Sequence, residues 1–336
     1  MSTRHSALEV VELLKQEQDS QIEAFEMQSG FRVGRDAFTA RAINETHCII
    51  YPPPELSEIL YRGQNKFYHQ CCPSLHRGNP TALDAFIGRI KNAEFELLIK
   101  KHPFVKGLSE EKICDHLIRI DFEGLAQHYG LKTELIDFTS DPFAAGFFAT
   151  CEFNKKENSY EPVMARDTIG VIYCYNFMLD YWNNKDKDYS NCIGLQPLPR
   201  PGIQKAFSYR LRRNKQFNKM PHITFKKFYH DPLVSLKFYE MFDGGRHLFP
   251  EDIIDSKADT IVNSMIFSED AFNIAVKKYW NGIGREVLKN KLNRKGIDIV
   301  DDAIARLTSE EIAPLHEQWP KVQHDFRSKI KFRRFM

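Results

Sequence analysis

The sequence has no apolar run that approaches the ~20 residues needed for a membrane-spanning helix, and its mean hydropathy is −0.46. The first fourteen residues also lack the apolar core of a secretory signal peptide. These absences predict a soluble, cytoplasmic protein that makes no contact with a membrane.

Cysteine is scarce, with seven residues scattered along 336. An odd, dispersed set in apolar surroundings is typical of buried thiols in a reducing compartment rather than of a disulfide framework. His69 precedes the vicinal pair Cys71 and Cys72, but no second pair at zinc spacing follows, so we predict no metal. The phosphate-binding glycine loop, the dinucleotide-binding glycine fingerprint and the nucleophile elbow are absent as well. No pattern in the sequence requires a cofactor.

Neither sign of charge is in large excess, because 47 Lys and Arg face 45 Asp and Glu. Residues 205–227 depart from this balance, with eight basic and no acidic residues. Phe207, Tyr209, Phe217 and Phe225 lie among these charges. Such a stretch predicts a surface for nucleic acid, with the aromatic rings stacking on bases, or else a solvated basic face. Residues 329–336 are also basic with interleaved aromatics.

Helical and strand periodicities both occur. We expect helices at 5–28, 81–101, 109–130, 142–149, 233–242 and through most of the chain after 252. We expect strands at 60–63, 133–138, 170–175 and 222–229, and a polar loop at 154–167. This mixture predicts an α+β protein with a modest mixed or antiparallel sheet and several packed helices. We divide it into an N-terminal helical segment (1–50), an α+β domain (51–260) and a C-terminal helical region with a basic tail (261–336).

Two helix ends carry specific signals. Gly130 is expected to be the left-handed residue that ends the helix at 109–130. Ser140 or Asp141 can cap the next helix, with Pro142 at its first position.

The first group of candidate site residues is Tyr61-Arg62-Gly63-Gln64, at a strand end. The Arg62 guanidinium offers a fork of donors to a carboxylate or phosphate. Gly63 would leave room for a ligand, and Gln64 adds an amide. In the alternative interpretation, Arg62 pairs with an internal acid such as Asp137 and braces the fold.

The second group begins with Gln127, His128 and Tyr129, at a predicted helix end. The helix dipole there favours an imidazolium, so we expect a raised pKa for His128 and a role as acid or base. Tyr129 can stack on a ligand or donate a hydrogen bond. The alternative is a helix-capping histidine and a core tyrosine.

The same group continues to Asp137, which follows an apolar strand and can orient Arg62 or His128. Thr139, Ser140 and the backbone amides that open the next helix form an end suited to anions.

The third candidate is Gln204, which follows a Pro-Gly turn. Its amide is expected to enter a cleft, with Arg200 and Lys205 as electrostatic support, unless the turn is a plain surface turn.

These motifs resemble those of the FRG domain family, over about residues 55–255. The family's aromatic-Arg-Gly-Gln and Pro-Ser-Leu-basic elements correspond to 61–64 and 73–77. Its Gln-His-Tyr-Gly-Leu-Pro-Thr-Arg-Leu-Leu-Asp-Trp-Thr element corresponds to 127–139, with Lys132, Glu134 and Phe138 in place of the proline, arginine and tryptophan. Glu134 reverses a charge beside the predicted site. The resemblance implies a domain and no particular reaction.

The layout is also similar to that of ADP-ribosyltransferases, in which an arginine holds the phosphates of NAD and an acid stabilises an oxocarbenium-like transition state. That analogy implies NAD as a substrate and Arg62 as the anion clamp. No carboxylate stands at Ala206, so Asp137 or Glu134 would have to take the acidic role.

Three hypotheses follow. The first is a nucleotide-binding enzyme, a transferase or NAD glycohydrolase; its catalytic residues are His128, Asp137 and Gln204, and its ligand-binding residues are Tyr61, Arg62, Gly63, Gln64, Gln127, Tyr129, Thr139 and Ser140. The second is a non-catalytic module that binds nucleic acid or senses nucleotides through residues 205–227. The third is a structural protein whose helical C-terminal region mediates oligomerisation.

Overall fold

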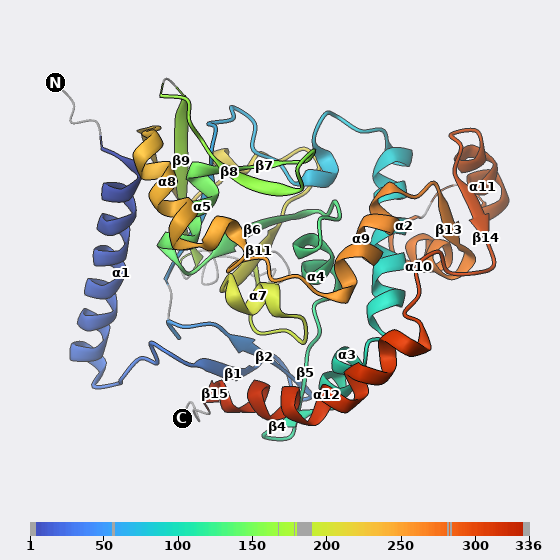
Figure 1. Cartoon of the computed structure of the whole chain (residues 1–336), viewed down its shortest axis with the longest axis horizontal. Helices are drawn as coiled ribbons and strands as arrows, with labels where there is room; N and C mark the ends of the chain where they lie inside the picture. Colours follow the sequence, from blue (N-terminus) through green and yellow to red (C-terminus); the bar gives the residue numbers. More distant parts are fainter. Residues whose placement is uncertain are drawn as a thin grey trace.

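The computed structural model describes residues 5–55, 58–166, 168–177, 179, 190–280, 282 and 284–331. At its centre lies a six-stranded sheet in which neighbouring strands run antiparallel (Figure 1). In spatial order its strands are β10 (Ser190–Cys192), β11 (Ala206–Arg210), β6 (Leu135–Thr139), β3 (Ile59–Gln64), β9 (Ile169–Asn176) and β12 (Ile223–Tyr229). The predicted α+β class is confirmed.

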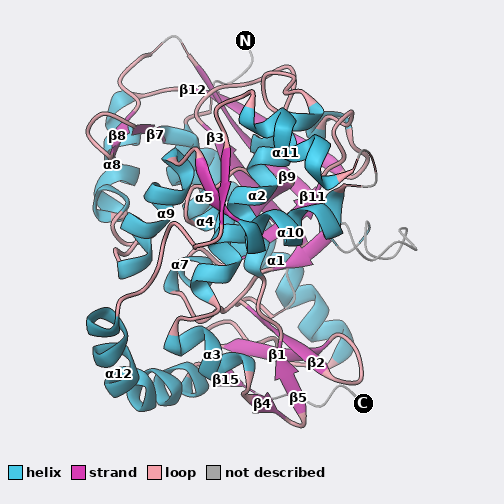
Figure 2. Ribbon diagram, turned by 90° about the vertical axis from the view of Figure 1, so that its right-hand side faces the viewer, coloured by secondary structure: helices cyan, strands magenta, loops and turns pink. Residues whose placement is uncertain are grey.

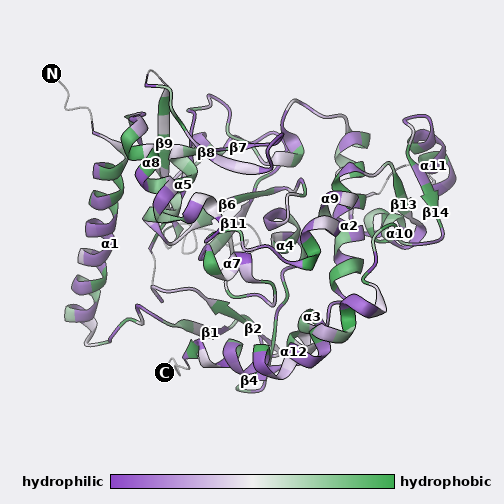
Figure 3. Cartoon of the chain, viewed as in Figure 1, coloured by the Kyte–Doolittle hydropathy of each residue, from purple (hydrophilic) through white to green (hydrophobic). Residues whose placement is uncertain are grey.

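Three helices cover one face of this sheet. Helix α5 (Pro142–Thr150) lies directly on β3, and α1 (Ala7–Ser29) and α8 (Pro232–Met241) pack around it. Asp141 caps α5 and Pro142 opens it, as predicted. Figure 3 shows hydrophilic and hydrophobic residues alternating along α1, the pattern of a helix with one buried side. The opposite face of the sheet carries a core rich in aromatic rings.

A second, smaller sheet lies below the first in Figure 1. Its order is β15 (Ile330–Lys331), β1 (Phe38–Ala42), β2 (His47–Tyr51), β5 (His116–Ile118) and β4 (Lys112–Ile113). Helices α3 (Pro103–Ser109) and α12 (Ser309–Ser328) pack beside it. The first fifty residues therefore contain strands as well as a helix, whereas the division into three segments stays a prediction.

Most of the remaining helices lie towards the right in Figure 1, on the side that faces the viewer in Figure 2. The remaining helices are α2 (Ala82–Ile99), α4 (Phe122–His128), α7 (Pro199–Ile203), α9 (Ile253–Asn263), α10 (Glu269–Tyr279) and α11 (Arg285–Asn293). Strand β13 (Ile266–Ser268) precedes α10 and strand β14 (Asp298–Val300) follows α11. The two strands pair in parallel. Apolar residues of α2 pack with α4 and α9 in one cluster and with α10 and α11 in another. Within the described ranges, no helix is both long and apolar enough to cross a membrane.

The helix predicted at 109–130 is wrong over most of its length. Ser109 ends α3, and strands β4 and β5 form a hairpin before α4 begins. Cys114 and Asp115 have φ angles of 45° and 68° at its turn, which is the backbone of a type I′ hairpin. The left-handed Gly130 is confirmed, with φ of 83°.

The polar loop predicted at 154–167 is a hairpin for much of its length. Strands β7 (Cys151–Asn154) and β8 (Ser159–Pro162) pair antiparallel, and Asn158 turns the chain with φ of 50°. Polar residues on an exposed hairpin mask the strand pattern. In the predicted basic tail, residues 332–336 lie outside the described residues.

Candidate functional site

Arg62 lies where two neighbouring strands of the central sheet separate. Strands β3 and β6 pair through Tyr61 and Thr139, and a continued antiparallel register would bring Gly63 opposite Asp137. Instead, Nη1 of Arg62 donates to the backbone oxygen of Asp137 at 3.0 Å. A guanidinium therefore occupies the place of the next backbone hydrogen bonds between the strands.

The Asp137 carboxylate is held by a chain of hydrogen bonds. The Leu135 amide donates to Oγ1 of Thr133, and that hydroxyl donates to Oε1 of Gln127. The Gln127 side chain must therefore present its NH₂ group, which donates to Oδ1 of Asp137. The other carboxylate oxygen lies 3.9 Å from Nη1 of Arg62. Gln127, Arg62 and Asp137, three of the candidate site residues, are thus brought together.

Asp137 is accessible to water although protein surrounds much of it. Its side chain is 44% exposed, whereas that of Arg62 is 12% exposed. Burial raises the pKa of Asp137 to about 6, and the charges of Arg62 and Arg77 only partly oppose that rise. A carboxylate that reaches solvent and titrates near neutral pH is suited to chemistry rather than to bracing alone.

Several buried polar atoms that are close to this pair in the register of the sheet have no hydrogen-bond partner among the described residues. They include Nε of Arg62, Oη of Tyr173 and Oγ of Ser208. Tyr173 stands opposite Arg62 in the register of β3 and β9, and Ser208 stands opposite Asp137 in that of β11 and β6. Unpaired buried donors and acceptors are uncommon in folded proteins, and a ligand can satisfy them.

His128 and Gln204 also come together. Burial, followed by the charge of Arg200, lowers the pKa of His128 to about 4, and a hydrogen bond with the Gln204 side chain opposes the fall. The raised pKa that we expected from the helix dipole is wrong, because α4 is short and its last residue is buried. At neutral pH His128 is therefore a neutral ring, and its buried Nε2 has no hydrogen-bond partner in the described part of the chain.

Arg200 serves the fold rather than supporting Gln204. Its guanidinium donates to the backbone oxygen of His128 at 3.1 Å, binds the Asp255 carboxylate and lies 4.3 Å from the centre of the Tyr129 ring. The Gln204 amide donates to the backbone oxygen of Leu248 at 2.8 Å. These contacts join α4 and α7 to the start of α9.

The other residues of the first motif have structural contacts. Tyr61 is 1% exposed, and its hydroxyl donates to the backbone oxygen of Leu14 on α1 at 3.4 Å. A Cβ atom on Gly63 would lie 1.8 Å from the backbone oxygen of Ala145, so the room at Gly63 is taken by α5 and not by a ligand. Gln64 accepts a hydrogen bond from the Cys71 thiol at 3.6 Å.

Three residues of the second motif likewise turn inward. Tyr129 is 4% exposed and donates to Asp252. Oγ1 of Thr139 accepts from the Asp141 amide, and the Ser140 hydroxyl donates to the backbone oxygen of Pro53. Asp141 itself caps α5, so an internal carboxylate already occupies the predicted anion-binding end. The structure does not bring these three hydroxyls to Asp137 as free groups.

Glu134 is neutralised by its neighbours. Its carboxylate binds Arg89 through one oxygen and Arg210 through the other. Burial alone would raise the pKa of Glu134, but these two guanidinium groups hold it below its ordinary value. The reversed charge that distinguishes the second motif is therefore compensated locally, and of the two acids considered from the sequence, Asp137 is the one that reaches Arg62.

Part of the basic stretch at 205–227 is engaged in contacts within the fold. Phe207, Tyr209 and Phe217 are buried in the aromatic core of the sheet, so their faces are closed to stacking bases. Lys205 binds Asp141 and Arg210 binds Glu123. Of the four predicted stacking rings, Phe225 is exposed, at 42%.

Sequence reasoning missed Ser208, Tyr173 and Tyr160. The charges of Asp137 and Arg200 both reach Tyr160, whose pKa is raised mainly by burial, and its ring stacks on Phe249 at 5.0 Å between centroids. Strand alternation can show that Ser208 and Tyr173 point out of the sheet. It cannot show which strands are neighbours, and that is what places these residues beside Arg62 and Asp137.

Residues 57–158 match the family model of the FRG domain. The chain is thus an FRG domain-containing protein, and the match includes Arg62, Gln127, His128 and Asp137 but ends before Gln204. No curated protein matches the chain. No solved structure matches it either.

Proposed function

We propose that the FRG domain of this chain binds a nucleotide, with NAD as the first candidate, and cleaves its nicotinamide–ribose bond. The single observation that supports this most is the water-accessible Asp137 carboxylate, 3.9 Å from Nη1 of the Arg62 guanidinium. Arg62 is the anion clamp, and Asp137 is the carboxylate that acts on the reacting sugar.

The hydrogen-bond donors of Arg62 and their distance from the Asp137 carboxylate support this assignment. The Nε of Arg62 is a buried donor that finds no partner within the described ranges, and a fork of guanidinium donors matches phosphate oxygens well. The carboxylate of Asp137 lies 3.9 Å from the same guanidinium, so an incoming phosphate can share Arg62 without having to displace a short ion pair.

The proposed reaction balances without a redox partner. The bond between the ribose carbon and the pyridinium nitrogen breaks, and its electron pair leaves with neutral nicotinamide. Water or an acceptor nucleophile then bonds to the carbon and releases one proton. The transition state resembles an oxocarbenium ion, which an ionised carboxylate stabilises. Asp137 therefore acts in its ionised form.

The surrounding groups position this carboxylate and the ligand. Gln127 fixes one oxygen of Asp137 and leaves the other facing Arg62. We assign Gln204 and the neutral His128 a positioning role, because Arg200 of α7 holds the backbone of His128 and the Gln204 amide is bound to the backbone of Leu248. The Tyr160 ring, on a separate hairpin, supplies an aromatic surface near the carboxylate.

Replacing Arg62 with alanine is expected to weaken NAD binding by tenfold or more. Hydrogen bonds between charged groups contribute about 1.5–3 kcal/mol each, and a tenfold change corresponds to about 1.4 kcal/mol. Arg62→Lys is expected to give an intermediate loss, because an ammonium group keeps the charge but lacks the fork. Isothermal titration calorimetry measures the affinity for NAD of the wild type, Arg62→Ala and Arg62→Lys proteins.

The matched control is Arg306→Ala, which removes a surface arginine paired with Asp302. It is expected to bind NAD like the wild type. Circular dichroism establishes that each variant is folded. Unchanged binding in a folded Arg62→Ala protein would exclude the clamp, whereas unfolding of both Arg62 variants would favour the structural alternative.

A further inference from the structure

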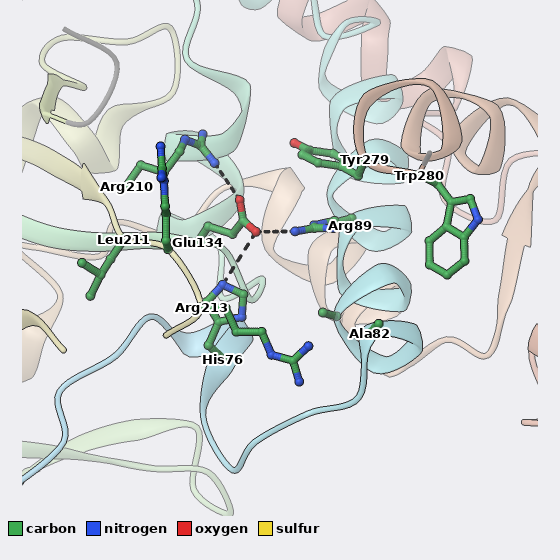
Figure 4. Close-up of a pocket in the computed structure, with 11 residues that line it drawn as sticks. His76, Ala82, Arg89, Glu134, Arg210, Leu211, Arg213, Tyr279 and Trp280 are labelled. Carbon is green, nitrogen blue, oxygen red and sulfur yellow. Dashed lines mark hydrogen bonds and ion pairs between the residues drawn. The ribbon is translucent and has the colours of Figure 1, made fainter. Parts of the chain in front are cut away.

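A pocket of about 490 Å³ is lined by Glu134 and by residues of η1 (Ser74–His76), α2, the end of β11 and the end of α10 (Figure 4). Its volume is within the range of roughly 300–1,000 Å³ typical of small-molecule sites. The lining residues are His76, Ala82, Ala85, Arg89, Glu134, Arg210, Leu211, Arg212, Arg213, Tyr279 and Trp280. None of the residues assigned above to the NAD site belongs to it.

The lining is strongly biased towards hydrogen-bond donors and positive charge. Four arginines face one carboxylate, and both oxygens of that carboxylate are already bound by Arg89 and Arg210. Arginine and tryptophan side chains carry donors and no acceptors. A ligand that enters this pocket must therefore supply acceptors and negative charge.

Several of these donors have no partner among the described residues. Nε of Arg89 and Nε1 of Trp280 are buried and unpaired. His76 is 6% exposed, and neither of its ring nitrogens has a hydrogen-bond partner. Its Nε2 lies 3.7 Å from Glu134, beyond hydrogen-bonding range. Leaving a buried donor unsatisfied costs about 1–3 kcal/mol, so these groups are consistent with a site that is completed by a ligand.

Arg213 stands at the solvent side of the pocket. Its guanidinium is bound to the backbone oxygen of Pro80, and within the described chain no carboxylate is paired with it. Its charge reaches His76. Tyr279 and Trp280 provide the ring surfaces of the opposite wall, where the Arg89 guanidinium lies 4.6 Å from the centre of the Tyr279 ring (Figure 4).

We propose that this pocket is a second ligand site, which binds a phosphate-bearing small molecule of about mononucleotide size, with the phosphate at Arg213 and His76 and the organic part against Trp280. This second site is independent of the proposed NAD reaction, because none of its residues belongs to the site built on Arg62 and Asp137. Glu134 organises it by holding Arg89 and Arg210 in place.

Tryptophan fluorescence during titration with AMP tests the proposal. Wild type is expected to show a saturable change that is absent in Trp280→Phe, while calorimetry shows that Trp280→Phe still binds AMP. Arg213→Ala is expected to weaken AMP binding by about tenfold or more. Arg213 is exposed, so this variant is expected to fold.

Arg246→Ala is the matched control, since it removes another exposed arginine whose partner is Asp243. It is expected to leave AMP binding unchanged, as is Arg62→Ala. Absence of AMP binding at millimolar concentration would overturn the proposal, and so would equal losses in Arg213→Ala and Arg246→Ala. AMP binding that is lost in Arg62→Ala but kept in Arg213→Ala would assign the ligand to the NAD site instead.

Discussion

Replacing Gly63 with alanine is expected to prevent stable folding. The new Cβ atom would lie 1.8 Å from the backbone oxygen of Ala145 and 2.7 Å from the backbone nitrogen of Ala149, both on α5. Backbone atoms of a buried helix cannot move aside as a flexible side chain can, so α5 would have to leave the sheet. We expect the free energy of unfolding to fall by more than about 4 kcal/mol, a range that only severe defects in a protein core reach.

Chemical denaturation measures the free energy of unfolding of any Gly63→Ala protein that is soluble. Absence of the variant from the soluble fraction would also be consistent with the expected failure to fold. Gly284→Ala is the matched control, because a Cβ atom there would have no neighbour within 4 Å. It is expected to lower the free energy of unfolding by at most about 1 kcal/mol, because Gly284 is the N-cap of α11 and alanine is a poorer N-cap than glycine. A Gly63→Ala protein as stable as the wild type would show that α5 does not press against β3.

Replacing Glu134 with glutamine is expected to destabilise the protein by roughly 2–3 kcal/mol. The carboxylate is 17% exposed and bridges Arg89 and Arg210, and removing one partner of a largely buried pair leaves the other charges uncompensated. Glu134→Arg restores the residue type that the second motif carries in the FRG family, and it is expected to be more damaging still. Urea unfolding of the three proteins gives the comparison.

The effect of Glu134→Gln should depend on pH. The folded pKa of Glu134 is held below its ordinary value of 4.5, so its contribution to stability is present above pH 4.5 and is lost as the pH falls through the lowered folded value. The difference in the free energy of unfolding between wild type and Glu134→Gln is therefore expected to become smaller at acidic pH. A gap that stays constant down to pH 3, or a Glu134→Arg protein as stable as the wild type, would contradict the bridging role.

Local signals in the sequence predicted much of the central sheet. Short strand-like segments predicted β3, β6 and β9, alternating residues predicted β12, and the Asp141-Pro142 pair predicted the start of α5. The hairpin of β4 and β5 was missed, because its strands have two and three residues. Segments so short are held by pairing with β2 rather than by a pattern of their own.

The candidate site was predictable only in part. That Arg62 meets Asp137 was considered from the sequence, whereas the inward roles of Tyr61 and Ser140 were not. Those roles depend on α1, since Tyr61 bonds Leu14 and the Ser140 backbone accepts from Gln18, partners 47 and 122 residues away. A motif shows that polar groups are close in sequence; the distant chain that packs on them decides which remain free for a ligand.

The most direct test of the proposed reaction is the consumption of NAD by the purified protein, with and without a cell extract as a source of acceptors, between pH 5 and 8. Because Asp137 acts when ionised and its pKa is about 6, turnover is expected to rise with pH through a midpoint near 6. Asp137→Asn is expected to abolish it while preserving the fold. No consumption of NAD at any of these pH values, or equal consumption by wild type and Asp137→Asn, would contradict the proposed function.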